Sequence, residues 1–488
     1  MLLRFTIGML SLAHASIVAA APGPTERVDN GLLPAITLID RPTRKMNLAQ
    51  RMEHYKVPAI SVAVIDNHRI AWAKAYGSLE SSSLKAATSG TLFQAGSLSK
   101  PISAAAALTL VQKGKLALDE PLNRYLASWK IPATQGIRGS DVTLRRVLSH
   151  TAGINVHGFR GYELTEKLPT LIQVLNGSAP ANSNPIQVNQ TPGQALRYSG
   201  GGYVVLQQAV EDVTGQRFDK AVRDVLFRPL RMSDSSFSQT QNMSSNRLAI
   251  GHKVAGEELR GGWHRFTEMA PAGLWTTPTD LARFVVWLME GINKNGSPWQ
   301  QAIAHQMVEP QKDLRGKEIR TPNGNRAGLG LVLEGEGPRF RISHSGTNVG
   351  YKAIMVGFPE TGQGAVIMAN SNTSGDLIKE VLRSVAAEYR WPEQFHEMLR
   401  AAPLADSALQ TLAGTYKFES REAKGKTMEV LVRPSKGSLR VSLPDGSDRE
   451  VHPLDNVQFV DPENGMKFLF QDDGVLRIPE YGISAKRN

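Results

Sequence analysis

The chain has 488 residues, a formal net charge of +11 and no cysteine. Its length exceeds the roughly 100 to 200 residues of one domain, so we expect about two or three units around at least one large core. The absence of cysteine excludes disulfides, a thiol nucleophile, a thiolate metal site and a lipidated cysteine anchor. Lys and Arg are spread along the chain without a tract or an aromatic-interleaved patch, so we expect no nucleic-acid partner.

The N-terminus has the composition of a secretory signal. Arg4 is followed by an apolar stretch and then by small residues at 19–21. We therefore predict a signal peptide over residues 1–21, a leader over residues 22–44, and a periplasmic or secreted mature protein. No later run approaches the roughly 20 apolar residues of a membrane-spanning helix, so we expect no stable membrane span.

The first ordered elements are a short helix and a pair of strands. The helix is predicted over residues 47–55. Residues 59–65 and 70–76 are typical of strands, and Asp66 and Asn67 mark the turn between them.

A long region over residues 116–324 is predicted to be mostly helical. Within it, a helix over residues 203–213 ends at Gly215, because glycine is a common helix stop. Another helix over residues 281–289 begins after Thr277, which can cap it.

Strands return after this region, and a helix over residues 377–389 follows them. The predicted strands are residues 329–333, 339–343, 351–358 and 365–370. Together with the early hairpin they form an antiparallel sheet with flanking helices and an inserted helical region, over residues 45–391. This is an α+β architecture whose active site would lie at the junction of the two parts.

The C-terminal part is predicted to be a separate, small all-β domain. Residues 392–403 form the linker, and residues 404–488 carry short strands separated by turns, as in an antiparallel barrel or sandwich. The strands are expected at residues 414–418, 428–432, 438–443, 457–460 and 466–470.

Ser97 and Lys100 form an SxxK pair at the start of an Ala- and Leu-rich segment. If a helix begins near Ser97, this spacing brings both side chains to one face. A serine hydroxyl needs a base to become a nucleophile, and a desolvated lysine amine can be that base. The amides at the helix start could stabilise a developing oxyanion. Ser82 and Lys85 have the same spacing, but they lie in a polar run that we predict to be a loop.

Two further segments place polar side chains beside glycines. Tyr198 could transfer a proton between nucleophile and leaving group, and Gly200 with its neighbours allows close backbone approach. A structural tyrosine beside a flexible turn is the alternative. His344 follows a predicted strand and could orient a substrate or tune the charge of Lys100, or it could be a solvated strand end.

Other patterns are absent or structural. We interpret His150 in LSHTAGI as structural. The sequence has neither a GxSxG elbow nor an HExxH motif, its histidines are scattered, and we expect no metal and no cofactor.

The motifs SLSK at Ser97, YSG at Tyr198 and HSG at His344 together resemble those of the serine β-lactamase and penicillin-binding-protein superfamily. They look most like its class C branch, which includes DD-peptidases, D-aminopeptidases and family VIII-type esterases. The resemblance extends over residues 47–391 and includes the segments VLSHTAGI, AGLWTTPTDLARF and GTNVGYKAIMVGFPE. It implies a β-lactamase/transpeptidase-like fold, and the tail resembles the lipocalin-like domain of some members.

The resemblance also implies roles for individual residues. Ser97 would be acylated, Lys100 and Tyr198 would share the base and acid work, and His344 would occupy the position of a strand lysine or histidine. The backbone amides of Ser97 and Thr347 would form the oxyanion hole. The substrate-binding residues would be Ser345, Gly346 and Gly200.

Gly200 departs from the family pattern, because it stands where the usual YxN motif has asparagine. Losing that hydrogen bond removes about 0.5–1.5 kcal/mol of substrate binding, which favours ester or peptide substrates over β-lactams. We expect an exported serine hydrolase that acts through an acyl-enzyme on an ester, a D-amino-acid peptide or a β-lactam. The substrate would be a small molecule or related to peptidoglycan. The alternatives are a slow-turnover penicillin-binding sensor and a serine acyltransferase with a non-water acceptor. Nothing in the sequence indicates an oligomeric state.

Overall fold

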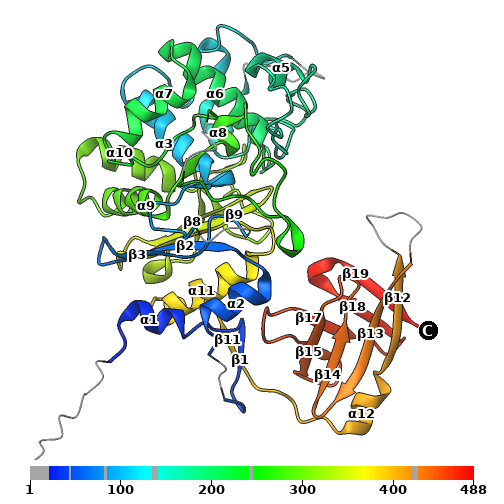
Figure 1. The fold of residues 1–488 in the computed structure, drawn as a ribbon. Helices are drawn as coiled ribbons and strands as arrows, with labels where there is room; N and C mark the ends of the chain where they lie inside the picture. Colours follow the sequence, from blue (N-terminus) through cyan, green and yellow to red (C-terminus); the bar gives the residue numbers. More distant parts are fainter. Residues whose placement is uncertain (1–20, 43–44, 82–84, 134–140, 241–245, 420–426) are drawn as a thin grey trace, which may run out of the picture.

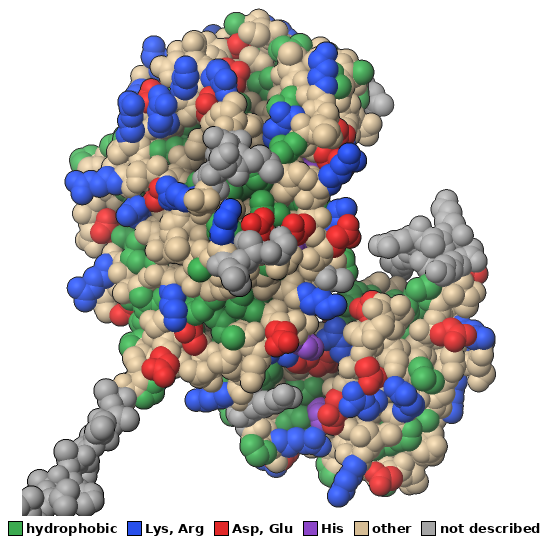
Figure 2. Space-filling view, in the orientation of Figure 1, with side chains coloured by type: hydrophobic (Ala, Val, Ile, Leu, Met, Phe, Trp, Pro, Cys, Tyr) green, Lys and Arg blue, Asp and Glu red, His purple; other side chains and the backbone are tan. Residues whose placement is uncertain are grey.

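The computed structural model describes residues 21–42, 45–81, 85–133, 141–240, 246–419 and 427–488. Residues 1–20 of the predicted signal peptide and Ser82 lie outside these ranges. Figure 1 shows a larger body of helices around a sheet and a smaller body formed by the C-terminal strands. Figure 2 shows acidic and basic side chains interspersed over one face of both bodies.

A seven-stranded antiparallel sheet forms the centre of the larger body. The N-terminal hairpin pairs with a strand from the far end of the unit, with Ile60 opposite Ala369. This confirms the predicted α+β architecture. In sheet order the strands are β3 (Arg69–Gly77), β2 (Ala59–Asp66), β10 (Gln363–Ala369), β9 (Tyr351–Phe358), β8 (Arg341–Asn348), β7 (Val332–Glu334) and β6 (Arg326–Ala327).

Helices cover both faces of this sheet (Figure 1). On one face, α1 (Pro24–Asp29), α2 (Leu48–Tyr55) and α11 (Gly375–Glu388) bury an apolar layer with the sheet. On the other, α9 (Pro278–Ile292) packs across β2, β3, β9 and β10 beneath the helical region.

Besides α9, the described part of the helical region contains the long helices α3 (Ser99–Gln112) and α6 (Gly200–Thr214) and several shorter ones. The shorter ones are α4 (Leu144–Leu148), α5 (Leu171–Asn176), α7 (Phe218–Val222), α8 (Met269–Ala272) and α10 (Pro298–Val308). Two predicted helix ends are confirmed. Thr277 Oγ accepts a hydrogen bond from the Asp280 amide at 3.2 Å, and Gly215 ends α6 in the left-handed conformation.

Two local predictions are wrong. The glycines at 200–202 form the first turn of α6 rather than a flexible turn. They are needed for packing, since a Cβ on Gly201 would lie 2.7 Å from the Asn155 carbonyl oxygen. The strand predicted at 339–343 is β8, which continues to Asn348, so His344 lies within a paired strand and not at its end.

The smaller body is a closed eight-stranded barrel, in which β19 pairs with β12. Its inside is filled by apolar side chains, and Phe459, Phe468 and Leu476 are fully buried. Strands β15, β18 and β19 were not predicted. The barrel elements are α12 (Asp406–Thr411), β12 (Gly414–Glu419), β13 (Thr427–Ser435), β14 (Ser438–Ser442), β15 (Asp448–Pro453), β16 (Gln458–Val460), β17 (Lys467–Phe470), β18 (Val475–Ile478) and β19 (Ile483–Arg487).

The predicted leader and linker meet in space. Strand β1 (Ile36–Leu38) pairs in parallel with β11 (Glu397–Leu399), which lies inside the predicted linker. The amides of Ala35 and Ile36 also donate to carbonyl oxygens of the barrel loop at Glu463 and Pro462. The segments therefore form a small connecting layer between the two bodies. Within the described ranges, every helix falls short of the length and apolar character needed to cross a membrane.

Candidate active site

Ser97 lies in a tight turn between a short strand and a long helix. Strand β4 (Phe93–Gln94) leads into a 3-10 turn over Gly96–Leu98, and α3 begins at Ser99. The helix thus starts two residues later than the predicted position. The turn still places Ser97 and Lys100 together.

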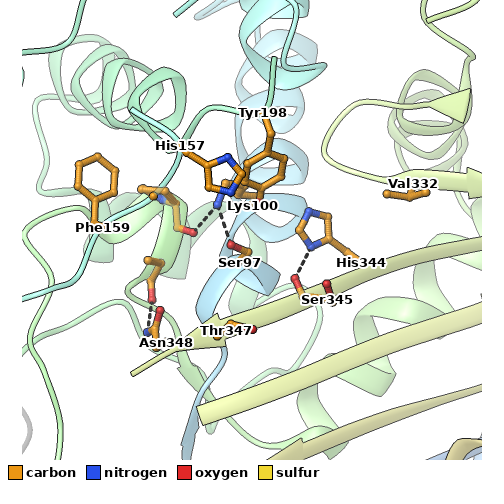
Figure 3. Close-up of a pocket in the computed structure, with 13 residues that line it drawn as sticks. Ser97, Lys100, His157, Phe159, Tyr198, Val332, His344, Ser345, Thr347 and Asn348 are labelled. Atoms are coloured by element: carbon orange, nitrogen blue, oxygen red, sulfur yellow. Dashed lines mark hydrogen bonds between the residues drawn. The ribbon is translucent and has the colours of Figure 1, made fainter. Parts of the chain in front are cut away.

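Lys100 contacts Ser97 directly (Figure 3). Its Nζ lies 3.0 Å from Ser97 Oγ and 3.0 Å from the Pro271 carbonyl oxygen of α8. The lysine is buried, and its Nζ lies 4.9 Å from the ring centre of Tyr198. None of the ion pairs found in the described part of the chain includes Lys100. The serine and lysine therefore meet in a pocket without a carboxylate partner.

Tyr198 contacts two imidazole rings. Its ring stacks on His150 with centres 4.3 Å apart and lies 4.8 Å from His157. The next residue, Ser199, caps α6: its Oγ accepts from the Gly202 amide at 2.9 Å. The Ser199 amide donates to His150 Nδ1 at 3.1 Å. His150 is thus part of the wall that positions Tyr198, which the sequence did not reveal.

Two histidines of the site, His344 and His150, have pKa values below the ordinary range. Burial, reinforced by the positive charge of Lys100, lowers the pKa of His344 to about 4. Burial and then Lys100 also hold the pKa of His150 well below its usual value. His344 Nδ1 lies 2.7 Å from the Ser345 carbonyl oxygen, which can only accept. Nδ1 therefore carries the proton, and Nε2 is the acceptor of this ring.

Strand β8 lies against the nucleophile turn because two glycines let the backbones touch. A Cβ on Gly346 would lie 1.9 Å from the Ala95 carbonyl oxygen, and one on Gly96 would lie 2.6 Å from the Thr347 amide nitrogen. Gly96 also has a φ of +53°. The amides of Ser97 and Thr347 therefore belong to adjoining segments, as an oxyanion hole requires.

Asn348 fastens the end of β8 to this arrangement. Its side-chain amide donates to Gln94 Oε1 at 2.8 Å and to the Ala272 carbonyl oxygen at 3.1 Å. Because Gln94 precedes the nucleophile turn and Ala272 ends α8, one buried side chain ties three segments of the site together.

These residues line a cavity of about 460 Å³. All four predicted catalytic residues, with Ser345 and Thr347, line it, whereas Gly346 and Gly200 lie behind the wall. The lining residues that the sequence did not predict are His157, Gly158, Phe159, Pro271, Ala272, Val332 and Asn348. The loop at residues 157–159 follows LSHTAGI, Ala272 begins AGLWTTPTDLARF, and Asn348 lies within GTNVGYKAIMVGFPE, so these segments of the resemblance could have indicated most of them. In the described ranges, no three His, Asp or Glu side chains are grouped as metal ligands.

Gly200 packs under the loop at residues 157–159. A Cβ at this position would lie 3.0 Å from the Phe159 ring and 3.1 Å from the His157 carbonyl oxygen. The loop therefore fills the space into which an asparagine side chain at this position would extend.

Comparison with known proteins gives relatives over most of the chain. Protein flp of Staphylococcus aureus (strain N315) is 24% identical over 325 residues, which are 65% of this chain and 60% of that protein. The chain thus spans about 60% of the length of the staphylococcal relatives. Penicillin-binding protein 4 of Amycolatopsis lactamdurans is 26% identical over 400 residues, 76% of this chain and 96% of that protein.

Solved structures share the fold. The octameric penicillin-binding protein homologue from Pyrococcus abyssi has a TM-score of 0.59 at 19% identity, over 88% of this chain and 96% of that one. SurE has a TM-score of 0.52 at 21% identity, over 90% of this chain and 97% of that one. A sequence model of the Beta-lactamase family matches residues 45–388. The chain therefore belongs to the Beta-lactamase family, whose members carry out hydrolysis and acyl transfer through a serine.

Proposed function

We propose that this protein is an exported serine hydrolase that cleaves esters through an acyl-enzyme on Ser97. The observation that carries the proposal is the 3.0 Å contact between Lys100 Nζ and Ser97 Oγ in a cavity lined by Tyr198 and His344. Nζ donates to both oxygens in the structure, and it can take the Ser97 proton once the amine has given up one of its own.

The reaction would run in two halves. In the first, the Ser97 proton passes to Lys100, Oγ bonds to the carbonyl carbon, and the bond to the leaving group breaks. The leaving group takes a proton through Tyr198, whose ring lies 4.9 Å from Lys100 Nζ. In the second, water attacks the acyl-enzyme, its proton returns through the same groups, and the free acid leaves. The amides of Ser97 and Thr347 would bind the oxyanion in both halves.

The environment of Gly200 supports esters as the substrate class. An amide or β-lactam substrate would lack the asparagine partner at this position, and Phe159 occupies the space. An ester carries no amide hydrogen that needs a partner, so it loses less binding free energy when the asparagine is absent.

The test is an activity panel with p-nitrophenyl acetate, nitrocefin and a D-alanyl-D-alanine peptide. We expect turnover of the ester to exceed that of the other two. We expect Ser97→Ala to lower kcat by about a thousandfold or more. Ser407→Ala, at an exposed position of α12, is the matched control and should behave as the native protein. Unchanged ester hydrolysis in Ser97→Ala would refute the mechanism.

The similarity to Penicillin-binding protein 4 favours one alternative, a protein that acylates with penicillin but turns over slowly. Fluorescent penicillin that remains on Ser97 without ester turnover would support this alternative. Fast loss of the label would exclude it.

Export is the remaining part of the proposal. It rests on the composition of residues 1–21, and on no feature of the fold. We expect N-terminal sequencing of the protein recovered from the periplasm or medium to begin just after one of the alanines at 19–21. An intact N-terminus on protein confined to the cytoplasm would contradict it.

A further inference from the structure

A second cavity, of about 520 Å³, lies beside the catalytic one. The two share a wall formed by His157, Gly158 and Phe159. Figure 3 shows Phe159 on the opposite side of Ser97 from His344. The second cavity also includes Arg197, which directly precedes Tyr198. A substrate bound at Ser97 could therefore extend across this wall into the second cavity.

The charge of the two cavities is positive. Their charged lining residues are Lys100, Arg160 and Arg197, and neither lining contains Asp or Glu. Arg160 is neutralised by Glu166, at 2.6 Å. Arg197 donates instead to the neutral amide oxygen of Asn189, and no ion pair found in the described ranges includes it. A guanidinium without a counter-charge, placed in a concave surface, favours an anionic ligand.

Side-chain amides make up much of the remaining lining. Asn155 is structural, because it accepts from the Gln187 amide at 2.8 Å and donates to the Pro185 carbonyl oxygen at 2.9 Å. These hydrogen bonds hold the Asn155 side chain in place in the cavity lining. Asn182 uses its amide nitrogen on the Gly161 carbonyl oxygen at 2.9 Å, which leaves its side-chain oxygen as an acceptor.

Two other amides keep donors for a ligand. Asn189 accepts from Arg197 through its oxygen and retains its amide hydrogens. Asn184 makes no hydrogen bond among the described residues and is exposed. Paired donors and acceptors of this kind match hydroxyl groups, each of which both donates and accepts. The planar guanidinium of Arg197 matches a carboxylate, which it can bind through two parallel hydrogen bonds.

We propose that the second cavity is a subsite for a carboxylate-bearing sugar unit of the substrate, with the ester of that substrate at Ser97. Arg197 binds the carboxylate, and the side chains of Asn182, Asn184 and Asn189 bind the hydroxyls. The face of Phe159 at the shared wall covers the apolar side of the sugar ring. This assignment rests on the proposed ester hydrolysis at Ser97, and it names the substrate class of that site.

The test uses two acetyl esters that differ in one group. 1-O-Acetyl-glucuronate carries a carboxylate where 1-O-acetyl-glucose carries a hydroxymethyl group, and acetate release is measured with the full chain. We expect kcat/KM to be about tenfold higher for the glucuronate ester, through a lower KM. Arg197→Gln should remove this preference. Arg228→Gln, at an exposed arginine that lines neither cavity, should keep it.

Gly158 offers an independent, steric test. Its φ is not positive, and a Cβ at this position would meet no atom within 4 Å, so a side chain fits without straining the backbone. Gly158→Phe adds bulk where the two cavities meet. We expect it to lower kcat/KM for both sugar esters by about tenfold relative to p-nitrophenyl acetate.

Several outcomes would overturn the subsite. They are equal kcat/KM for the two sugar esters in the native protein, a preference that persists in Arg197→Gln, and equal losses for all three esters in Gly158→Phe. An Arg197-dependent preference for an O-acetylseryl dipeptide carboxylate over both sugars would assign the cavity to peptides instead. Failure of the proposed function looks different, because then the native protein hydrolyses no ester, p-nitrophenyl acetate included, and both proposals fall.

Discussion

At the scale of single residues, His344 makes the stability of the fold depend on pH. Burial and the nearby Lys100 lower its pKa from 6.5 to about 4. Above pH 6.5 the ring is neutral in both folded and unfolded chains, so it adds no pH dependence to the free energy of unfolding. Between pH 6.5 and 4 the unfolded chain takes up a proton that the folded chain does not, so stability falls as the pH falls. Below about pH 4 both states bind the proton and the loss stops growing.

We therefore predict that His344→Gln is less sensitive to acid than the native protein. The pKa difference corresponds to about 3 kcal/mol of folding free energy lost by the native chain between pH 6.5 and 4. Urea unfolding of both proteins across this range measures the difference between their slopes. Parallel curves would show that His344 titrates with an ordinary pKa.

His150 yields a second prediction, about the position of Tyr198. The residue has a φ of +59°, and its Nδ1 accepts from the Ser199 amide at 3.1 Å. His150→Leu leaves that amide without a partner and places a bulky side chain in a left-handed conformation. We expect a loss of about 1–3 kcal/mol in the free energy of unfolding and a fall in kcat, because the ring that packs on Tyr198 is gone.

His150→Asn is the matched variant, because asparagine tolerates the left-handed conformation and retains an acceptor. We expect its stability to lie close to that of the native protein. Thermal unfolding and p-nitrophenyl acetate kinetics of both variants test the pair. If the two variants lose the same stability, the hydrogen bond to Ser199 contributes nothing.

At the scale of elements, the proposed oxyanion hole depends on how closely β8 approaches the nucleophile turn. Gly346→Ala would place a methyl group 1.9 Å from the Ala95 carbonyl oxygen, so the strand must move away. We expect kcat/KM for esters to fall by about a hundredfold, because displacing the Thr347 amide spoils the oxyanion hole. The overpacked contact should also cost about 1–3 kcal/mol of stability.

Gly23→Ala is the control for this variant. Gly23 is exposed before α1, and a Cβ at that position meets no atom within 4 Å. It should change neither activity nor thermal stability by a measurable amount. An active, stable Gly346→Ala protein would mean that the strand does not form part of the oxyanion hole.

The sequence predicted these elements best where apolar pattern and turn residues agree. The hairpin of β2 and β3 and the cap at Thr277 follow from local rules. The polar end of β8 was missed because its strand character comes from pairing with β9, which no local pattern reports. Likewise the glycines that begin α6 are poor helix formers, and their place is set by contacts with residues 154–159.

The same limit applies to the site. The motifs SLSK, YSG and HSG indicated Ser97, Tyr198 and His344, because each carries chemistry in its own side chain. His157, Phe159 and the packing role of His150 were beyond sequence reasoning, since they depend on where a long loop returns over α6. In the barrel, the charged strand β15 lacked the apolar alternation that marks its neighbours.

At the scale of the whole molecule, one buried arginine connects the barrel to the larger body. Arg51 of α2 binds Glu380 of α11 at 2.6 and 2.9 Å and Glu463 of the barrel at 2.6 Å. Glu380 is fully buried, whereas Glu463 is one-third exposed. The pair with Glu380 therefore belongs to the core of the larger body, and the pair with Glu463 fastens the barrel to it.

Because the two carboxylates differ in burial, the two ion pairs should differ in what their loss does to the protein. Arg51→Met leaves the buried carboxylate of Glu380 without its ion-pair partner, with the Tyr55 hydroxyl still donating to it at 2.8 Å, and we expect it to cost about 3–5 kcal/mol of stability. Glu463→Gln removes only the ion pair between Arg51 and the barrel. It should leave ester hydrolysis and the unfolding of the larger body unchanged, while β11 and the rest of residues 392–403 become more accessible. Limited proteolysis, with fragments identified by mass spectrometry, should then show several-fold faster cleavage in this segment.

Glu429→Gln, at an exposed strand of the barrel, is the matched control. If it is cleaved as fast as Glu463→Gln, the barrel is held in place by the paired strands β1 and β11 and not by Arg51.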